Sequence, residues 1–233
     1  MTALTPEEWE VLLLSLKVSG VAMACALPLA FALAWVLARW RFPGAIILDA
    51  LVHLPLVLPP VVTGWLLLIA LAPNSTLGRF FESALGLTFM FRWTGAALAA
   101  TIMALPLMVR AMRLSIEAVD RRYEQAARTL GASRLRTFAT ITLPLTLPGI
   151  LAALVLGFAR SVGEFGATIT FASNIPGETR TLPLAIYSAL QVPGAEWQVA
   201  RLAGLSILLS LGALVISEWL ARRNRAGAMR YVI

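Results

Sequence analysis

The sequence predicts an all-α integral membrane protein that crosses the bilayer five or six times. Of its 233 residues, 59% are hydrophobic and only 13% are charged, whereas soluble domains carry about 25% charged residues. The mean hydropathy is +0.82. Several apolar runs reach the roughly 20 residues that a helix needs to cross the hydrocarbon core. A helix also satisfies its own backbone hydrogen bonds, as lipid requires.

Five candidate spans follow one another in a single transmembrane domain that occupies residues 1–233. The fourth span is long and is interrupted by prolines and glycines, so it is either one span or a span followed by a half-helix or re-entrant piece. A further short helix is expected at 181–191, which leaves the number of spans at five or six. The candidate spans are 11–38, 48–72, 94–112, 141–172 and 202–221.

The distribution of arginine orients these spans. Nineteen basic and twelve acidic residues give a net charge of +7, which in so apolar a chain is better explained by cytoplasmic loops than by nucleic-acid binding. The segment after span one, the segment 110–136 and the tail after residue 221 are rich in arginine. The positive-inside rule therefore places the N-terminus outside and the C-terminus in the cytoplasm.

Three isolated side chains are expected to have ordinary roles. Cys25 is the single cysteine, so it cannot form an internal disulfide, and we expect it to be buried within span one. Lys17 lies near the outer end of that span and can extend to the membrane interface. His53 follows Asp49 by four residues, which favours a local hydrogen bond over a metal site.

The polar segment 115–137, between spans three and four, has the pattern of an amphipathic helix. Gly131 is expected to end this helix, and Ser133 to cap a second short one. An amphipathic helix in the cytoplasm either lies on the membrane or docks in a partner's groove, and the small residues of its stripe favour the groove. The apolar stripe consists of Ile116, Val119, Tyr123, Ala126 or Ala127, and Leu130.

Two runs in and after this segment have a distinctive spacing. Gln125 begins the run Gln-Ala-Ala-Arg-Thr-Leu-Gly, and nine residues later Ile141 begins Ile-Thr-Leu-Pro. This resembles the cytoplasmic signature of the membrane subunits of bacterial ABC importers, which is Glu-Ala-Ala, three residues, Gly, nine residues, Ile, one residue, Leu-Pro. Gln125 stands where that pattern has Glu. The adjacent Glu124 would point about 100° away on a helix, so it is not taken as a substitute.

The resemblance extends to other parts of the chain. The segment 161–168, the run Asn-Ile-Pro-Gly at 174–177 and the segment 181–187 look like the corresponding stretches of molybdate and tungstate permeases, with sulfate permeases as close relatives. The resemblance is strongest there, at 54–60 and at 124–144. It implies the fold of a type I ABC importer permease in the bacterial inner membrane and import of molybdate, or alternatively of tungstate, sulfate or thiosulfate.

The resemblance also implies partners and a mechanism. It implies a homodimer with the path between two copies, two cytoplasmic ATP-binding subunits, and an external oxyanion-binding protein. Closure of the ATP-binding subunits would move the segment 115–137, the coupling helix, and open the path by alternating access. The residues that it assigns to this coupling contact are Glu124, Gln125, Ala126, Ala127, Leu130 and Gly131.

Candidates for the path or gate come from the charge and the small residues within the spans. Glu164 is a charge inside a span, but an ion pair with Arg160, four residues earlier, is the simpler expectation, because a carboxylate repels a dianion. We therefore expect a hinge or gate near Glu164. Glu218 and Arg222, also four residues apart, are expected to form an ion pair on the surface. Hydroxyls and backbone N–H groups can receive anions, although such residues also pack helices. The other path candidates are Thr63, Gly64, Gly163, Thr168 and Thr170.

Several kinds of site have no basis in the sequence. The single lysine lies outside any G-x-x-x-x-G-K-[ST] motif, so the chain is not expected to be an enzyme and another chain must hydrolyse ATP. With one histidine and one cysteine, neither a metal site, a cofactor nor a catalytic triad is expected. A secondary transporter, the less favoured alternative, would need inverted repeats and mid-membrane titratable groups, but the sequence shows no repeat and only Glu164 as such a group. An intramembrane enzyme would need paired catalytic groups at one depth, and none are evident.

Overall fold

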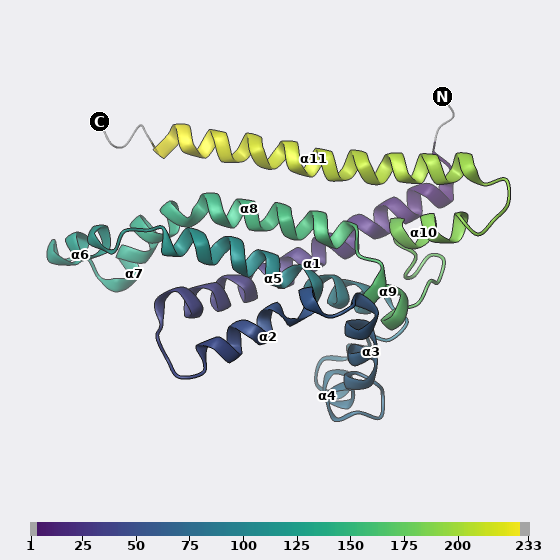
Figure 1. The fold of residues 1–233 in the computed structure, drawn as a ribbon, viewed down its shortest axis with the longest axis horizontal. Coiled ribbons are helices and arrows are strands. Elements are labelled where there is room, and N and C mark those ends of the chain that lie inside the picture. Colours follow the sequence, from purple (N-terminus) through teal and green to yellow (C-terminus); the bar gives the residue numbers. More distant parts are fainter. Residues whose placement is uncertain (1–3, 229–233) are drawn as a thin grey trace.

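Four long helices run roughly along the long axis of the molecule in the computed structural model, which describes residues 4–228 and the side chains through residue 216 (Figure 1). The predicted all-α membrane architecture is confirmed, since every regular element in residues 4–228 is helical. These long helices are α1 (Pro6–Arg39), α5 (Trp93–Glu117), α8 (Leu143–Val162) and α11 (Glu196–Ala228).

Shorter helices lie between the long ones, and they define two ends of the molecule. We call the end with α6 and α7 the α6 end, and the end with α10 and the start of α1 the α10 end (Figure 1). The short helices are α2 (Ala45–Val57), α3 (Pro60–Ala70), α4 (Thr76–Leu85), α6 (Arg121–Thr129), α7 (Arg134–Thr137), the π-helical turn η1 (Phe138–Thr142), α9 (Gly166–Phe171) and α10 (Leu182–Ala189).

Four helices of the described chain are long and apolar enough to cross a membrane, or five spans result if one bent pair is a span. Six spans, the upper number expected, are therefore not reached. The predicted span 48–72 is not one continuous helix: α2 and α3 meet at an angle of 114°, so it is either a broken span or a re-entrant loop. The cause is Pro59 followed by Pro60, which cannot donate backbone hydrogen bonds to continue α2. The segment 141–172 was expected to be either one span or a span followed by a half-helix or re-entrant piece. The structure shows the second arrangement, in which the short helix α9 follows α8.

The core of the bundle is formed where α1, α5 and α8 pack together. Alanines recur on the buried face of α1, and the facing side of α5 carries alanines and methionines with almost no exposure. Small side chains let membrane helices approach closely, so dispersion contacts are made along most of their length. The fully buried alanines of these helices include Ala22, Ala26, Ala30, Ala34, Ala96, Ala104 and Ala153.

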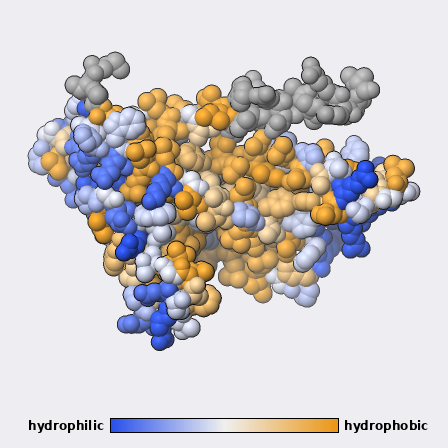
Figure 2. Space-filling model, turned by 180° about the vertical axis from the view of Figure 1, so that it is seen from behind, coloured by the Kyte–Doolittle hydropathy of each residue, from blue (hydrophilic) through white to orange (hydrophobic). Residues whose placement is uncertain are grey.

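The surface of the molecule has a broad apolar band between two hydrophilic ends, as expected of a chain that crosses a bilayer (Figure 2). Cys25 is exposed on this surface, so its expected burial was wrong. It shares α1 with the buried Ala22 and Ala26, but it lies on the side of the helix that faces away from the core. The expected pair of Glu218 with Arg222 lies outside the side chains that the structure describes.

The apolar stripe predicted from Ile116 to Leu130 does not belong to one helix. The α5 helix ends at Glu117, and α6 begins at Arg121 after Asp120, whose side chain accepts a hydrogen bond from Arg122 N. Asp at this position caps a new helix and so ends the periodicity that the sequence pattern assumed. Ile116 is therefore buried in the core, whereas Leu130 is 88% exposed.

Candidate functional site

The α6 segment, residues 115–137, closes the turn between α5 and α8 at one end of the bundle (Figure 1). The predicted helix end and second cap are both confirmed. Gly131 has φ of +86°, a conformation that disfavours other residues, and the Ser133 side chain accepts a hydrogen bond from Arg136 N. Tyr123 and Leu130 are 60% and 88% exposed on this segment. It therefore presents apolar side chains beyond the membrane-embedded band.

The six residues expected at the coupling contact do not all face the same way. Gln125, Ala126, Leu130 and Gly131 are exposed, and Ala127 is half-buried. A Cβ added at Gly131 would meet nothing within 4 Å, so a partner can approach the backbone there. The Gln-Ala-Ala run thus forms a largely open surface, with Gln125 and Ala126 exposed.

Glu124, by contrast, turns back towards the bundle. Its carboxylate accepts hydrogen bonds from the guanidinium of Arg39 at 2.7 and 3.3 Å, and from Oγ1 of Thr142 at 2.7 Å. Arg39 is the last residue of α1, and its guanidinium lies 5.3 Å from the ring centroid of Trp35. A single carboxylate therefore joins α6 to the end of α1 and to the turn that leads into α8. Such charge-assisted bonds are stronger than neutral ones.

Two helix breaks lie side by side on another part of the bundle. Pro60 begins α3 directly after the first break, and Gly166 begins α9 directly after the second. A Cβ at Gly166 would lie 2.6 Å from Cβ of Pro60, and a Cβ at Gly64 would lie 2.6 Å from the carbonyl oxygen of Ala167. Only glycine permits this approach, so α3 and α9 contact each other backbone to backbone.

Glu164 occupies the second break and is 3% exposed. One carboxylate oxygen lies 2.5 Å from Nη1 of Arg160, which confirms the expected ion pair, and the other accepts a hydrogen bond from Ala167 N at 2.8 Å. The carboxylate of Glu164 thus compensates the positive charge of Arg160, and it also caps the first turn of α9. A buried ion pair needs such additional hydrogen bonds to offset the loss of hydration.

The remaining path candidates are placed near these breaks. Thr63 and Gly64 are buried on α3, Thr168 is buried on α9, and Gly163 is exposed at the end of α8. The hydroxyl of Thr63 is buried without a hydrogen-bond partner among the described residues. Thr170, in contrast, donates to the carbonyl of Gly166 within its own helix. The structure therefore brings the α3 and α9 candidates to one contact.

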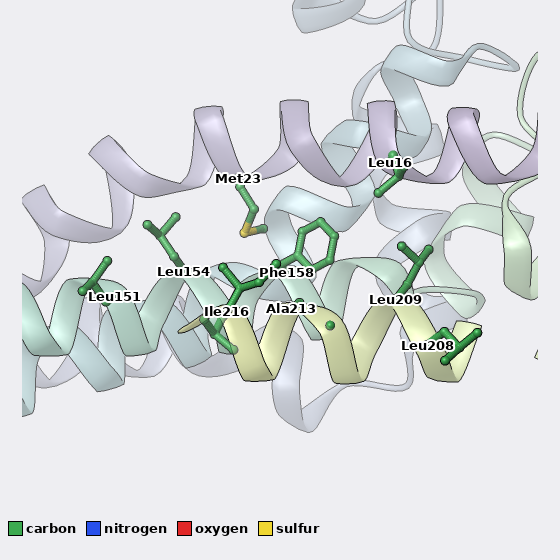
Figure 3. Close-up of a pocket in the computed structure, with 11 residues that line it drawn as sticks. Leu16, Met23, Leu151, Leu154, Phe158, Leu208, Leu209, Ala213 and Ile216 are labelled. Carbon is green, nitrogen blue, oxygen red and sulfur yellow. The ribbon is translucent and has the colours of Figure 1, made fainter. Parts of the chain in front are cut away.

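An apolar pocket of about 440 Å³ lies elsewhere, where α1, α8 and α11 meet (Figure 3). No hydroxyl, charged or amide side chain lines it, so it offers an oxyanion only backbone groups that its helices already use. This pocket is therefore unsuited to an oxyanion. Its lining consists of Leu16, Met23, Leu151, Leu154, Val155, Phe158, Leu208, Leu209, Gly212, Ala213 and Ile216.

Sequence reasoning missed the partners that lie far away in the chain. Arg39 and Glu124 are 85 positions apart, and no local spacing indicates their contact. Lys17 was expected at the membrane interface, and its Nζ lies 3.7 Å from the ring centroid of Trp93. Nδ1 of His53 lies 2.9 Å from the carbonyl of Asp49, as the local hydrogen bond requires. The described residues contain no cluster of side chains able to hold a metal.

Solved structures share this architecture at low sequence identity. A bacterial ABC transporter that imports the acidic polysaccharide alginate has a chain with a TM-score of 0.69 and 20% identity, and the match covers 96% of this chain and 80% of that one. The MetNI methionine ABC transporter in an inward-facing conformation gives a TM-score of 0.68 at 16% identity, over 93% and 94% of the two chains. These matches establish the fold of an ABC importer permease.

Relatives are also similar in sequence. Residues 26–226 match the family described as binding-protein-dependent transport system inner membrane component. The molybdenum transport system permease protein ModB of Escherichia coli K12 is 58% identical over 226 residues, 96% of this chain and 99% of the relative. ModB of Haemophilus influenzae is 58% identical, over 90% and 92% of the two chains. The sulfate permease CysT of Salmonella typhimurium is 36% identical, over 82% and 70%. The chain is thus a multi-pass membrane protein that belongs to the binding-protein-dependent transport system inner membrane component family.

Proposed function

We propose that this chain is the permease subunit of an ATP-driven importer of molybdate. The observation that carries the proposal is 58% identity, over nearly the full length of both chains, to relatives named as molybdenum transport permeases. The relative named as a sulfate permease is more distant, at 36% identity, which favours molybdate over sulfate. The chain itself contains no nucleotide-binding motif, so a separate subunit supplies the hydrolysis of ATP.

The α6 segment is the part of the chain that contacts the ATP-binding subunit in this proposal. Its open Gln-Ala-Ala surface and the exposed Leu130 offer a short amphipathic helix to a groove. Glu124 supports the transmission of movement, because it ties α6 to both Arg39 and Thr142. A shift of α6 would therefore act on α1 and α8 together and not on the loop alone.

The contact between α3 and α9 is the proposed gate. The backbones meet at Gly64 and Gly166, and both helices follow a break in the chain, α3 after α2 and α9 after α8. Glu164 is proposed as a hinge residue and not as an anion ligand, since its charge is already compensated by Arg160. Buried Thr63 and Thr168 are the proposed lining of the path.

The proposed assembly contains two copies of this chain, two ATP-binding subunits and an external oxyanion-binding protein. The path is proposed to lie between two copies because the four or five spans of one chain are too few to enclose a pore. The proposed orientation places the α6 end in the cytoplasm and the α10 end outside, consistent with the arginines of the α6 segment. ATP-driven closure of the cytoplasmic subunits would open the path to the outside, and hydrolysis would reset it.

The experiment combines copurification with uptake. We expect the full chain to copurify with an ATP-binding subunit from native membranes, and ATPase activity to rise when molybdate-loaded binding protein is added. The variant Leu130→Asp should lose most of the copurifying subunit, because it places a charge on the exposed apolar surface of α6. The matched control is Leu77→Asp on α4, where an exposed leucine lies outside the α6 segment.

Two results would contradict the proposal in separate ways. Equal loss of the ATP-binding subunit in Leu130→Asp and Leu77→Asp would remove α6 from the contact. Stimulation by sulfate-loaded but not molybdate-loaded binding protein would keep the mechanism and change the cargo.

A further inference from the structure

A polar pocket of about 290 Å³ lies at the α6 end, between the last turn of α1 and one face of α6. Three arginines line it together with a single carboxylate, so the lining has an excess of positive charge. Two tryptophans form its apolar part. The lining residues are Trp35, Arg39, Trp40, Arg121, Glu124, Gln125 and Arg128.

The arginines of this pocket are not fully used by the protein. The Arg39 side chain is only 10% exposed and is paired with Glu124, yet its Nε is buried without a hydrogen-bond partner among the described residues. Arg121 and Arg128 are exposed, and neither forms an ion pair with any side chain of residues 4–216. Because Glu124 already serves Arg39, the two arginines of α6 have donors available for an anion.

The tryptophans place this pocket at the edge of the membrane. Trp35 and Trp40 lie at the end of α1, which is one of the candidate spans, and Trp40 is 61% exposed. Tryptophan is enriched at the membrane–water interface because its ring is apolar and its N–H is polar. The Trp35 ring also packs edge-on against Phe138, with 5.3 Å between ring centroids. The pocket therefore combines an apolar wall of two tryptophans with arginines that can bind an anion.

We propose that this pocket binds the headgroup phosphate of an anionic phospholipid, such as phosphatidylglycerol. Basic pockets between membrane helices at the cytoplasmic side bind such headgroups, and arginine forms paired hydrogen bonds with phosphate oxygens. Arg121 and Arg128 donate to the phosphate, and Trp35 and Trp40 contact the glycerol and the first part of the acyl chains. A free inorganic anion would use the arginines but not the tryptophan wall. The inference adds a binding site to the proposed function, and lipid binding itself is independent of the cargo.

The test measures lipid retention by native mass spectrometry of the full chain purified in detergent. Phosphatidylglycerol, phosphatidylcholine and inorganic phosphate are each titrated. We expect one tightly held phosphatidylglycerol per chain and no comparable phosphatidylcholine. The double variant Arg121→Gln with Arg128→Gln should bind phosphatidylglycerol about 25-fold more weakly, since each arginine near the membrane surface is worth about five-fold in affinity.

The control removes the same charge at the same end of the molecule. Arg134→Gln with Arg136→Gln alters two exposed arginines of α7 that do not line the pocket, and should leave the affinity within about two-fold. Equal binding by the Arg121/Arg128 variant and the unaltered chain would overturn the proposal, as would equal loss in both double variants. Displacement of the lipid by micromolar inorganic phosphate would assign the pocket to a soluble anion. Loss of a copurifying ATP-binding subunit with the lipid retained would assign the arginines to that subunit's contact.

Discussion

The bundle of α1, α5 and α8 and the contact between α3 and α9 both use small residues, but for different purposes. In the bundle, buried alanines let long continuous helices pack side by side. At the α3–α9 contact, Gly64 and Gly166 allow the backbones of two helices to meet. Each of these helices follows a break in the chain. A continuous helix keeps most of its backbone hydrogen bonds even around an internal proline, whereas a broken helix can rotate about its break. The bundle therefore has the features of a frame, and the α3–α9 contact is the part that we propose to move.

The largest expected effect of this difference is at Glu164, the charged group in the second break. Glu164→Ala should lower the free energy of unfolding by about 3 kcal/mol, because Arg160 loses its partner and Ala167 N its acceptor. Thermal unfolding of the purified chain measures this. Glu164→Gln should lose less, since its amide oxygen can still accept from Ala167 N.

The control for Glu164 is Glu82→Ala, which removes an exposed carboxylate of α4 and should change the free energy of unfolding by less than about 0.5 kcal/mol. If Glu164→Ala were no more damaging than Glu82→Ala, the break would not depend on the buried pair.

A smaller effect is expected at Gly64, where the added atom meets backbone. The Cβ of Gly64→Ala would lie 2.6 Å from the carbonyl oxygen of Ala167 and 2.9 Å from Cβ of Thr170. We expect a loss of about 2 kcal/mol in the free energy of unfolding, typical of overpacking, and a larger loss of molybdate uptake than of folded protein. Gly20→Ala is the control, because its Cβ would meet nothing within 4 Å. Uptake that falls equally in the two variants would argue against movement at this contact.

What could be predicted from the sequence depends on how far apart the interacting residues lie. The glycine that follows the end of α6, Gly131, the cap at Ser133 and the Arg160–Glu164 pair are all local features, and all three are present. The ion pair between Arg39 and Glu124 joins residues that are 85 positions apart in the sequence, and no periodic pattern predicts such a contact.

The failures of sequence reasoning have an equally local cause. The periodicity from Ile116 to Leu130 predicts one helix because periodicity does not include capping residues, and Asp120 caps a new helix in the middle of this stretch. In the predicted span 48–72, the apolar run alone does not indicate how sharply the chain turns at Pro59 and Pro60, which is by 114°. The burial expected of Cys25 followed from its apolar neighbours and not from the direction of its side chain.

The smallest effect on the free energy of unfolding is expected at Gly157, which lies on α8 in the bundle. It can be compared directly with Gly64. A Cβ at Gly157 would lie 2.6 Å from Sδ of Met108 and 2.9 Å from Sδ of Met23, as close as the clash at Gly64. Here, however, the obstacles are side-chain atoms of two methionines, including Cγ of Met108 at 2.8 Å, and methionine can adopt other rotamers. Alanine in place of glycine within a helix also gains about 0.5–1 kcal/mol.

Gly157→Ala should therefore change the free energy of unfolding by less than about 0.5 kcal/mol, measured by the same thermal unfolding. Combining it with Met108→Ile should lower the free energy of unfolding by about 1 kcal/mol more than the sum of the two single changes. The reason is that a β-branched side chain cannot move aside. Additive effects in that double variant would mean that the frame yields through its backbone, and the distinction between a rigid bundle and a mobile α3–α9 contact would fail.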